Sequence, residues 1–227
     1  MNHKLSLKGI LFDFDGLIID SESAVYQAWQ ELYRSWGEEL IFSDWQQLVG
    51  KSSLEADPMD QLAALVGARF DRQSARKEAA ALEMEYVSQK PIRPGVEEII
   101  ARARKEGLKL GIASSSTSDW VLTHLSRLDL RAPFQSISCA DDVEQAKPDP
   151  ALYRLSLTKL NLTAEQAIVF EDSPNGVLAA KRAGIFCVAV PNPVTRRIPF
   201  HDNGGQPDLV LDSLQDFPLE QYLREGA

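Results

Sequence analysis

The 227-residue chain lacks long hydrophobic runs, an excess of positive charge and more than two cysteines. No apolar stretch approaches the roughly 20 residues that cross a bilayer, so we expect no transmembrane helix. The short apolar run near the amino terminus ends in aspartates and does not resemble a signal peptide. Cys139 and Cys187 lie in apolar segments, which predicts two buried, reduced thiols in a cytoplasmic protein.

The net charge of the chain limits the kinds of partner that we expect it to bind. A formal net charge of −9 argues against nucleic acid and anionic membranes. It is compatible with a small phosphorylated metabolite, because a bound cation can invert the field within a site. The three histidines show no spacing that indicates a zinc site. No feature of the sequence points to an obligatory protein partner.

Short apolar runs rich in Ile, Leu and Val recur along the chain. They are continuous rather than alternating, which is typical of parallel strands covered on both faces. Helical patterns lie between them, at 94–106, 150–160 and 173–183. The alternation predicts an α/β fold with a doubly wound parallel sheet. The expected strands are 8–14, 109–114, 136–140, 167–170, 186–190 and 209–211.

A long stretch after the first strand has no strand pattern and several amphipathic helical segments. We expect it to form a helical-bundle cap over the carboxyl ends of the strands, with Trp29 and Trp36 in the interior of the cap. The predicted division is a discontinuous core, 1–20 and 91–227, and a cap domain, 21–90. Its helices are expected near 23–37, 53–67 and 72–89.

Acidic and other polar side chains follow the predicted strands. Because the carboxyl ends of parallel strands share one edge of the sheet, we expect these side chains to converge there. Four carboxylates gathered at one edge repel one another, and a single lysine does not offset them. A hard divalent cation does, and Mg²⁺ with a phosphate substrate is the usual choice. The residues concerned are Asp13, Asp15, Ser114, Lys147, Glu171 and Asp172.

Each of these residues has a role in phosphoryl transfer. Asp13 is the expected nucleophile and would form an aspartyl phosphate. Asp15 would protonate the leaving oxygen and then deprotonate water. Gly16 leaves room where a phosphate approaches closely. Ser114, with nearby backbone N–H groups, would hold the phosphoryl oxygens, and Lys147 would neutralise their charge.

Taken singly, some of these residues have ordinary structural roles. Ser114 is also a common type of helix cap, and Lys147 a common solvated loop residue. The pair Glu171–Asp172 is more specific, since two acids that abut a buried strand are costly without a partner. We expect this pair to complete the oxygen shell of the cation, and Ser115 to add to the phosphate site.

Four segments in order, DFDGLIIDSE, IASSS, KPDP and FEDSPNGVLAAKRAG, resemble the motifs of the haloacid-dehalogenase-like hydrolase superfamily. The resemblance is to its β-phosphoglucomutase-like phosphatases, and it implies a Rossmann-like core with a helical cap that opens and closes. It also implies that Asp13 is the nucleophile and Asp15 the acid/base, which favours phosphoryl over carbon–halogen chemistry. The implied Mg²⁺ ligands are Asp13, the Asp15 carbonyl, Asp172 and Glu171, the last directly or through water.

The cap decides between two activities of this branch. The segment LVGKSS, residues 48–53, resembles the substrate-facing loop, in which the sugar-phosphate mutases carry an arginine. This chain has Lys51, which binds phosphate as a point charge without a bidentate fork or is simply solvated. We therefore expect a phosphatase of a sugar phosphate or a similar small metabolite, with a β-phosphoglucomutase-type mutase as the alternative.

A phosphoaccepting signalling switch is a third interpretation of the same cluster of acids, hydroxyl and lysine. Such a domain needs only about half of this length. An acid/base at Asp15 and a helical lid both favour turnover over a stable phosphoaspartate.

Overall fold

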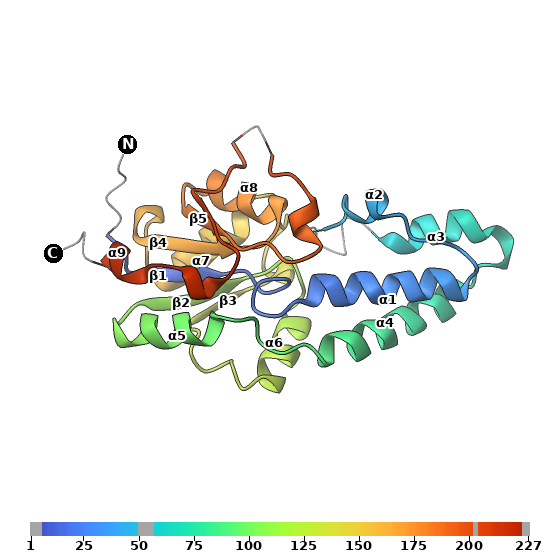
Figure 1. Ribbon diagram of the computed structural model, residues 1–227, viewed down its shortest axis with the longest axis horizontal. Helices are drawn as coiled ribbons and strands as arrows, with labels where there is room; N and C mark the ends of the chain where they lie inside the picture. The colour runs from blue at the N-terminus through green and yellow to red at the C-terminus, as the bar shows by residue number, and fades with distance from the viewer. Residues whose placement is uncertain (1–5, 50–56, 202–203, 224–227) are drawn as a thin grey trace.

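The computed structural model describes residues 6–49, 57–201 and 204–223. A six-stranded parallel sheet forms its centre, in the order β3-β2-β1-β4-β5-β6 (Figure 1). The predicted α/β fold is confirmed. The strands are β1 (Gly9–Phe12), β2 (Lys109–Ala113), β3 (Ser136–Ser138), β4 (Ala167–Glu171), β5 (Phe186–Ala189) and β6 (Leu209–Val210).

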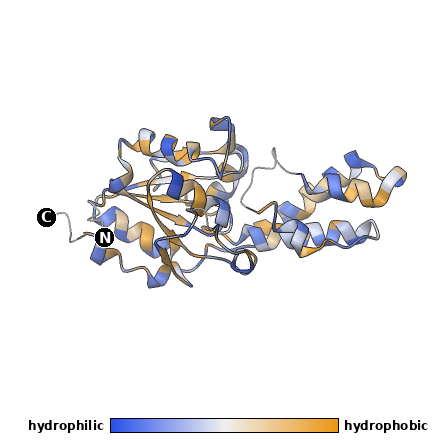
Figure 2. Cartoon of the chain, turned by 90° about the horizontal axis from the view of Figure 1, so that it is seen from above, coloured by the Kyte–Doolittle hydropathy of each residue, from blue (hydrophilic) through white to orange (hydrophobic). Residues whose placement is uncertain are grey.

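Helices cover both faces of this sheet, as continuous apolar strands require. Ile10 and Phe12 of β1 pack in the cluster that contains α5, α6 and α9, whereas Leu11 packs in the cluster of α7 and α8. Figure 2 shows hydrophobic strands enclosed between helices whose outer turns are hydrophilic. These helices are α5 (Val96–Lys105), α6 (Ser118–Arg127), α7 (Ala151–Leu160), α8 (Pro174–Arg182) and α9 (Leu219–Leu223).

Local signals in the sequence set several helix ends. Ser173 caps α8 by accepting a hydrogen bond from the Gly176 N–H at 3.2 Å, and Pro174 occupies the first turn. Helix α7 begins just after Asp149 and Pro150, and Asp149 Oδ1 accepts a hydrogen bond from the Ala151 N–H at 2.9 Å. Short 3₁₀ helices lie at η1 (Gly67–Arg69), η2 (Ala140–Asp142), η3 (Ala164–Gln166), η4 (Thr195–Arg197) and η5 (Leu214–Asp216).

The helices that follow β1 project beyond the carboxyl ends of the strands (Figure 1). Most residues of a separate hydrophobic cluster lie on them, including Trp29, Leu32 and Trp45, and Val194 from the segment after β5 joins it. Trp29 of α1 is buried in this cluster, and Trp36, just after α1, is partly buried and packs on Phe70 with ring centroids 5.1 Å apart. The helices are α1 (Ser21–Ser35), α2 (Phe42–Trp45), α3 (Pro58–Val66) and α4 (Arg72–Ser88).

The two segments that connect these helices to the sheet lie side by side. Ile19 forms an antiparallel bridge with Ile92, and the Arg93 N–H donates to the Ile18 carbonyl at 2.8 Å. The predicted boundaries near residues 20 and 90 fall on this crossing, and the division into core and cap domains stays a prediction. Within the described part of the chain, no helix combines the length and apolar character needed to cross a membrane.

Candidate active site

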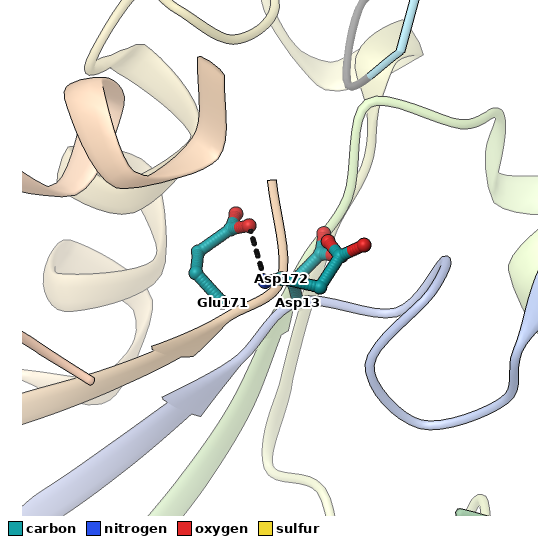
Figure 3. A group of neighbouring side chains, drawn as sticks. All are labelled: Asp13, Glu171 and Asp172. Carbon is teal, nitrogen blue, oxygen red and sulfur yellow. Dashed lines mark hydrogen bonds between the residues drawn. The ribbon is translucent and has the colours of Figure 1, made fainter. Parts of the chain in front are cut away.

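The register of the sheet brings three carboxylates together. Phe12 of β1 pairs with Phe170 of β4, so Asp13 leaves one strand beside Glu171 at the end of its neighbour. The Asp13 N–H donates to the Phe170 carbonyl at 2.9 Å, which fixes this alignment. One ligand atom each from Asp13, Glu171 and Asp172 lies within 4.8 Å of the others, and all three residues are buried (Figure 3).

Lys147 lies between two of these acids. Its Nζ is 2.5 Å from Asp13 Oδ1 and 2.6 Å from Glu171 Oε1, and the side chain is only 2% exposed. Burial alone would lower the pKa of Lys147, but Asp13 and Glu171 raise it above its ordinary value. The lysine therefore stays charged and forms the positive part of the cluster.

One lysine does not balance the cluster. Burial, and then the neighbouring Glu171, raise the pKa of Asp13 to about 8 despite its contact with Lys147. Burial, followed by Asp13 and Glu171, raises the pKa of Asp172 well above its ordinary value. A buried set of oxygen donors with surplus negative charge suits a hard divalent cation. The donor set therefore fits the metal that the sequence predicts.

The Glu171 carboxylate is already well supplied with hydrogen-bond donors. Its Oε1 accepts from Lys147 and from the Tyr153 hydroxyl at 2.5 Å. Its Oε2 accepts from the N–H groups of Asp172, at 3.0 Å, and Ser173, at 3.3 Å. A Cβ on Gly176 would lie 1.8 Å from Oε1, so glycine leaves the space for this carboxylate. Figure 3 shows Glu171 set apart from Asp13 and Asp172, whose carboxylates lie side by side.

Gly16 leaves space for two neighbouring side chains, and its role in the approach of a phosphate stays a prediction. Its φ is +82°, and a Cβ there would lie 2.2 Å from Asp172 Oδ2 and 2.5 Å from Asn192 Nδ2. Asn192 Nδ2 donates to Asp172 Oδ2 at 2.6 Å. The space that glycine leaves is occupied by these two side chains, so Gly16 acts on the site by allowing Asp172 its position.

Asp15 lies at the wall of the cleft nearest α1 and α6. Its Oδ1 accepts from the Ser21 hydroxyl at 2.8 Å and from the Trp120 indole N–H at 2.9 Å. Its Oδ2 accepts from the Ser116 hydroxyl at 2.7 Å and from Ser114 at 3.3 Å. The carboxylate is thus oriented by side chains from the α1 helix, the β2–α6 loop and α6.

Two adjoining cavities lie around these residues. The inner one, of about 40 Å³, is bounded by Asp13, Ser114, Lys147 and Asp172 together with Asp15, Glu22, Ser115, Ser116 and Ser173. The outer one, of about 240 Å³, shares part of that wall and extends to Glu83 and Trp120. A larger cavity of about 640 Å³ lies at the opposite edge of the sheet, where it has none of the strand-end carboxylates. The inner and outer cavities, which adjoin the strand-end carboxylates, are therefore the candidate active site.

Most of the predicted site residues meet at this edge. Asp13, Ser114 and Lys147 adjoin one another, and Ser115 lines both cavities. Lys51 lies outside the described residues. Sequence reasoning did not find the residues that orient the carboxylates, namely Ser21, Ser116, Trp120, Tyr153 and Asn192.

Glu22 is a further acid that the sequence patterns did not single out, although it is the last residue of the DFDGLIIDSE segment. It lines both cavities from the first turn of α1. Removal from bulk water, followed by the charges of Asp15 and Asp13, raises its pKa to about 8. Its position adds a further carboxyl group to the wall of the cleft.

Comparisons with known proteins show which sequences and folds this chain resembles. YhcW from Bacillus subtilis, which is named as a phosphatase, is 41% identical over 220 residues and covers 96% of both chains. The validoxylamine A 7'-phosphate phosphatase of Streptomyces hygroscopicus subsp. limoneus is 35% identical over 183 residues, which cover 81% of this chain and 85% of the relative. The crystal structure of β-phosphoglucomutase from Clostridium difficile has a TM-score of 0.76 at 23% identity and covers 97% of each chain, which shows the shared fold.

A doubly wound sheet with buried acids at the carboxyl end of β1, and with a helical insertion after that strand, is typical of a class of Rossmann-like hydrolases. The sequence profile described as haloacid dehalogenase-like hydrolase matches residues 10–190, and the chain belongs to this family. The resemblance seen in the motifs is confirmed. Together with the named relatives, the match supports a phosphomonoester hydrolase.

Proposed function

We propose that this protein is a Mg²⁺-dependent phosphatase that hydrolyses a small phosphorylated metabolite through an aspartyl phosphate. The observation that carries the proposal is the position of Asp13 in the inner cavity, where its Oδ1 is fixed by Lys147 at 2.5 Å. Its second oxygen is left for attack on phosphorus. The relatives named as phosphatases support the same reaction.

The first half-reaction forms a bond between an Asp13 oxygen and phosphorus and breaks the bond to the leaving alcohol. Protonated Asp15 gives its proton to the departing oxygen. Lys147 and the Ser114 hydroxyl offset the charge on the phosphoryl oxygens. Because Asp15 is held by Ser21, Ser116 and Trp120, its carboxyl group must turn from that wall toward the leaving oxygen.

The second half-reaction returns the enzyme to its starting state. Asp15, now ionised, removes a proton from a water molecule that attacks the phosphorus of the aspartyl phosphate. The bond between phosphorus and the Asp13 oxygen breaks, and inorganic phosphate leaves. Movement of the α1–α4 helices over the carboxyl edge would exclude bulk water during the first transfer.

The carboxylates of Asp13 and Asp172, with the backbone carbonyl of Asp15, would hold the cation. When bound, Mg²⁺ supplies charge neutralisation for the transferring phosphoryl group. Glu171 has its oxygens engaged by Lys147 and Tyr153 and by backbone N–H groups, so we assign it contact with the cation through water.

A sugar-phosphate mutase is the second candidate, because the β-phosphoglucomutase fold is shared. A mutase returns the phosphoryl group to a second hydroxyl of the substrate, whereas a phosphatase gives it to water. A signalling switch would keep it on Asp13. The three differ in the fate of the phosphoryl group, and phosphate release distinguishes them.

The test is release of inorganic phosphate from a panel of phosphorylated sugars, polyols and small acids, with and without Mg²⁺. Asp13→Asn removes the nucleophile with little change in shape, and Asp212→Asn is its matched control because Asp212 is 83% exposed. We expect Mg²⁺-dependent turnover in the parent and in Asp212→Asn, and a loss of more than about 10³-fold in Asp13→Asn. Stoichiometric labelling without release, or interconversion of hexose phosphates alone, would overturn the proposal.

A further inference from the structure

The segment that follows β5 contacts both the carboxylate cluster and the inserted helices α1–α4. It begins at Asn192, which is 1% exposed, and runs through η4 (Thr195–Arg197). In Figure 1 the orange-red segment after β5 lies on the side of the core that faces these helices. No described residue of the segment lines the inner or the outer cavity. Any effect of this segment on the reaction is therefore indirect.

Asn192 forms the end of the segment that touches the site. Its Nδ2 donates to Asp172 Oδ2 at 2.6 Å and reaches the Gly16 carbonyl at 3.5 Å. Its Oδ1 accepts hydrogen bonds from the N–H groups of Val194, at 2.9 Å, and Thr195, at 3.0 Å. The Asn192 N–H donates to the Thr195 hydroxyl oxygen at 2.9 Å. One amide group thus orients the Asp172 carboxylate and also fixes the turn that leads into η4.

The other end of the segment touches the inserted helices. Val194 is 5% exposed and packs in the hydrophobic cluster that these helices form. The Arg197 guanidinium carbon lies 3.4 Å from the ring centroid of Phe42 in α2, which is a cation–π contact. Val194 and Arg197 therefore join α2 to the same turn that Asn192 holds beside Asp172.

We propose that the segment 192–197 couples the affinity for Mg²⁺ to the docking of α2 on Arg197, with Asn192 as the positioning residue for Asp172. This inference rests on the proposed Mg²⁺ site. With α2 docked, the turn is held at both ends and the Asn192 amide stays directed at Asp172. Without that contact the turn is held at one end only, and the carboxylate loses part of its orientation. Because such coupling is reciprocal, bound Mg²⁺ favours the docked position of α2 by the same factor.

The first test measures Mg²⁺ binding by isothermal titration calorimetry, without substrate. Arg197→Gln removes the cation from Phe42 at an exposed position. We expect the Kd for Mg²⁺ to rise about fivefold, which is at the low end of coupling between two sites. Loss of a positive charge alone would strengthen the binding of a cation, so the expected direction separates coupling from electrostatics.

Arg196→Gln is the matched control for that variant. Arg196 is the exposed neighbour of Arg197 in η4, and it pairs with Asp212 at 2.7 Å instead of with the inserted helices. The change in charge is identical in the two variants. A Kd that rises equally in both, or that stays unchanged in Arg197→Gln, would overturn the coupling.

Asn192→Ala breaks the connection at its other end. Loss of the hydrogen bond to Asp172 should raise the Kd for Mg²⁺ at least about tenfold. In the double variant, Arg197→Gln should then add less than about twofold, because no connection remains for it to break. Fully additive effects of the two substitutions, in chains that circular dichroism shows to be folded, would overturn the coupling.

Hydrogen–deuterium exchange measures the reciprocal effect and does not depend on the Asn192 variant. Mg²⁺ should slow exchange of the amides of α2 (Phe42–Trp45) by up to about fivefold in the parent, and this protection should be lost in Arg197→Gln. Exchange in α2 that does not respond to Mg²⁺ in the parent would overturn the coupling.

The two proposals fail in different ways. A parent enzyme that binds Mg²⁺ and releases phosphate, with the same Kd in Arg197→Gln, would reject the coupling and leave the phosphatase intact. A folded parent that neither binds Mg²⁺ nor releases phosphate from any ester would reject both proposals.

Discussion

The Tyr153 hydroxyl donates a hydrogen bond to Glu171 Oε1 at 2.5 Å, and the same oxygen also accepts a hydrogen bond from Lys147. The tyrosine is buried on α7, whereas the acid ends β4. Burial and the Glu171 charge raise the pKa of Tyr153 well above its ordinary value, so the phenol remains a donor. Helix α7, which packs on one face of the sheet, thus supplies a hydrogen-bond donor to the charged cluster.

Tyr153→Phe removes that hydrogen bond from a buried carboxylate. We expect the free energy of unfolding to fall by about 1.5–3 kcal/mol, because Glu171 loses a donor that water cannot replace. Urea unfolding measures the change. Tyr86→Phe is the control, since Tyr86 bonds Glu31 at an exposed position and should change stability by less than about 0.5 kcal/mol. Equal effects of the two variants would show that the buried bond has no special weight.

Lys147→Met leaves the buried acids without their ammonium group. We expect a loss of roughly 3–5 kcal/mol of stability, because breaking a buried pair strands its partners. We expect kcat to fall by at least about 100-fold, because charge on the transferring group is no longer offset. Chemical unfolding and phosphate release measure the two effects.

Lys159→Met provides the comparison for that variant. Lys159 pairs with Asp142 at 3.0 Å, and both side chains are about one-third exposed (35% and 37%). Such a pair contributes about 0–1 kcal/mol. A Lys147→Met enzyme that retains activity within tenfold of Lys159→Met would contradict the assigned role.

Gly16→Ala should lower the free energy of unfolding by more than the strain of a left-handed backbone alone. At Gly37, φ is +80° and a Cβ would meet nothing within 4 Å, so Gly37→Ala measures the backbone strain, about 1–2 kcal/mol. Gly16 has a similar φ, but its Cβ would collide with Asp172 and Asn192. We expect Gly16→Ala to be the less stable variant and to need a higher Mg²⁺ concentration for half-maximal activity. Matching Mg²⁺ titrations in the two variants would reject the proposed effect on Asp172.

The stability of the metal-free protein should depend on pH. The pKa of Asp13 is raised from 3.8 to about 8, so the folded state retains a proton where the unfolded state has lost it. The free energy of unfolding therefore falls as pH rises from about 4 to about 8. Mg²⁺ binds the ionised carboxylates, so its stabilising effect should grow over the same range.

Thermal unfolding at several pH values, with EDTA or with Mg²⁺, tests this linkage. The difference between the Tm with Mg²⁺ and the Tm with EDTA should widen toward pH 8 in the parent. In Asp172→Asn this difference should be smaller than in the parent. Asp212→Asn, at the surface, should match the parent. A difference that shrinks with rising pH would contradict the prediction.

The strands were predictable because both faces of the sheet are covered. In a chain with alternating helical patterns, continuous apolar runs such as 8–14 and 186–190 indicate buried parallel strands. The observed strands Gly9–Phe12 and Phe186–Ala189 are shorter than these runs. The polar residues just beyond the strand ends could therefore be assigned to the carboxyl edge of the sheet.

The supporting residues were not predictable from periodicity. Tyr153 fits the apolar stripe of α7, and that pattern does not reveal which atom its hydroxyl reaches. Trp120 follows a hydroxyl-rich loop, but its bond to Asp15 depends on how α6 packs beside β1. Asn192 meets Asp172 only because β4 and β5 are neighbours in the sheet. Such contacts arise from the tertiary arrangement.

The central place of β1 also has a consequence for biosynthesis. Gly9 pairs with Lys109 on one side and with Ala167 on the other, so both partners of the first strand are translated long after it. A nascent chain carries Asp13 on a strand that lacks at least one of its two sheet neighbours until β4 has emerged. A ribosome-bound chain stopped at residue 160 should thus leave Asp13 open to proteases, which limited proteolysis can measure. Translation itself would delay the first turnover until β4 has docked.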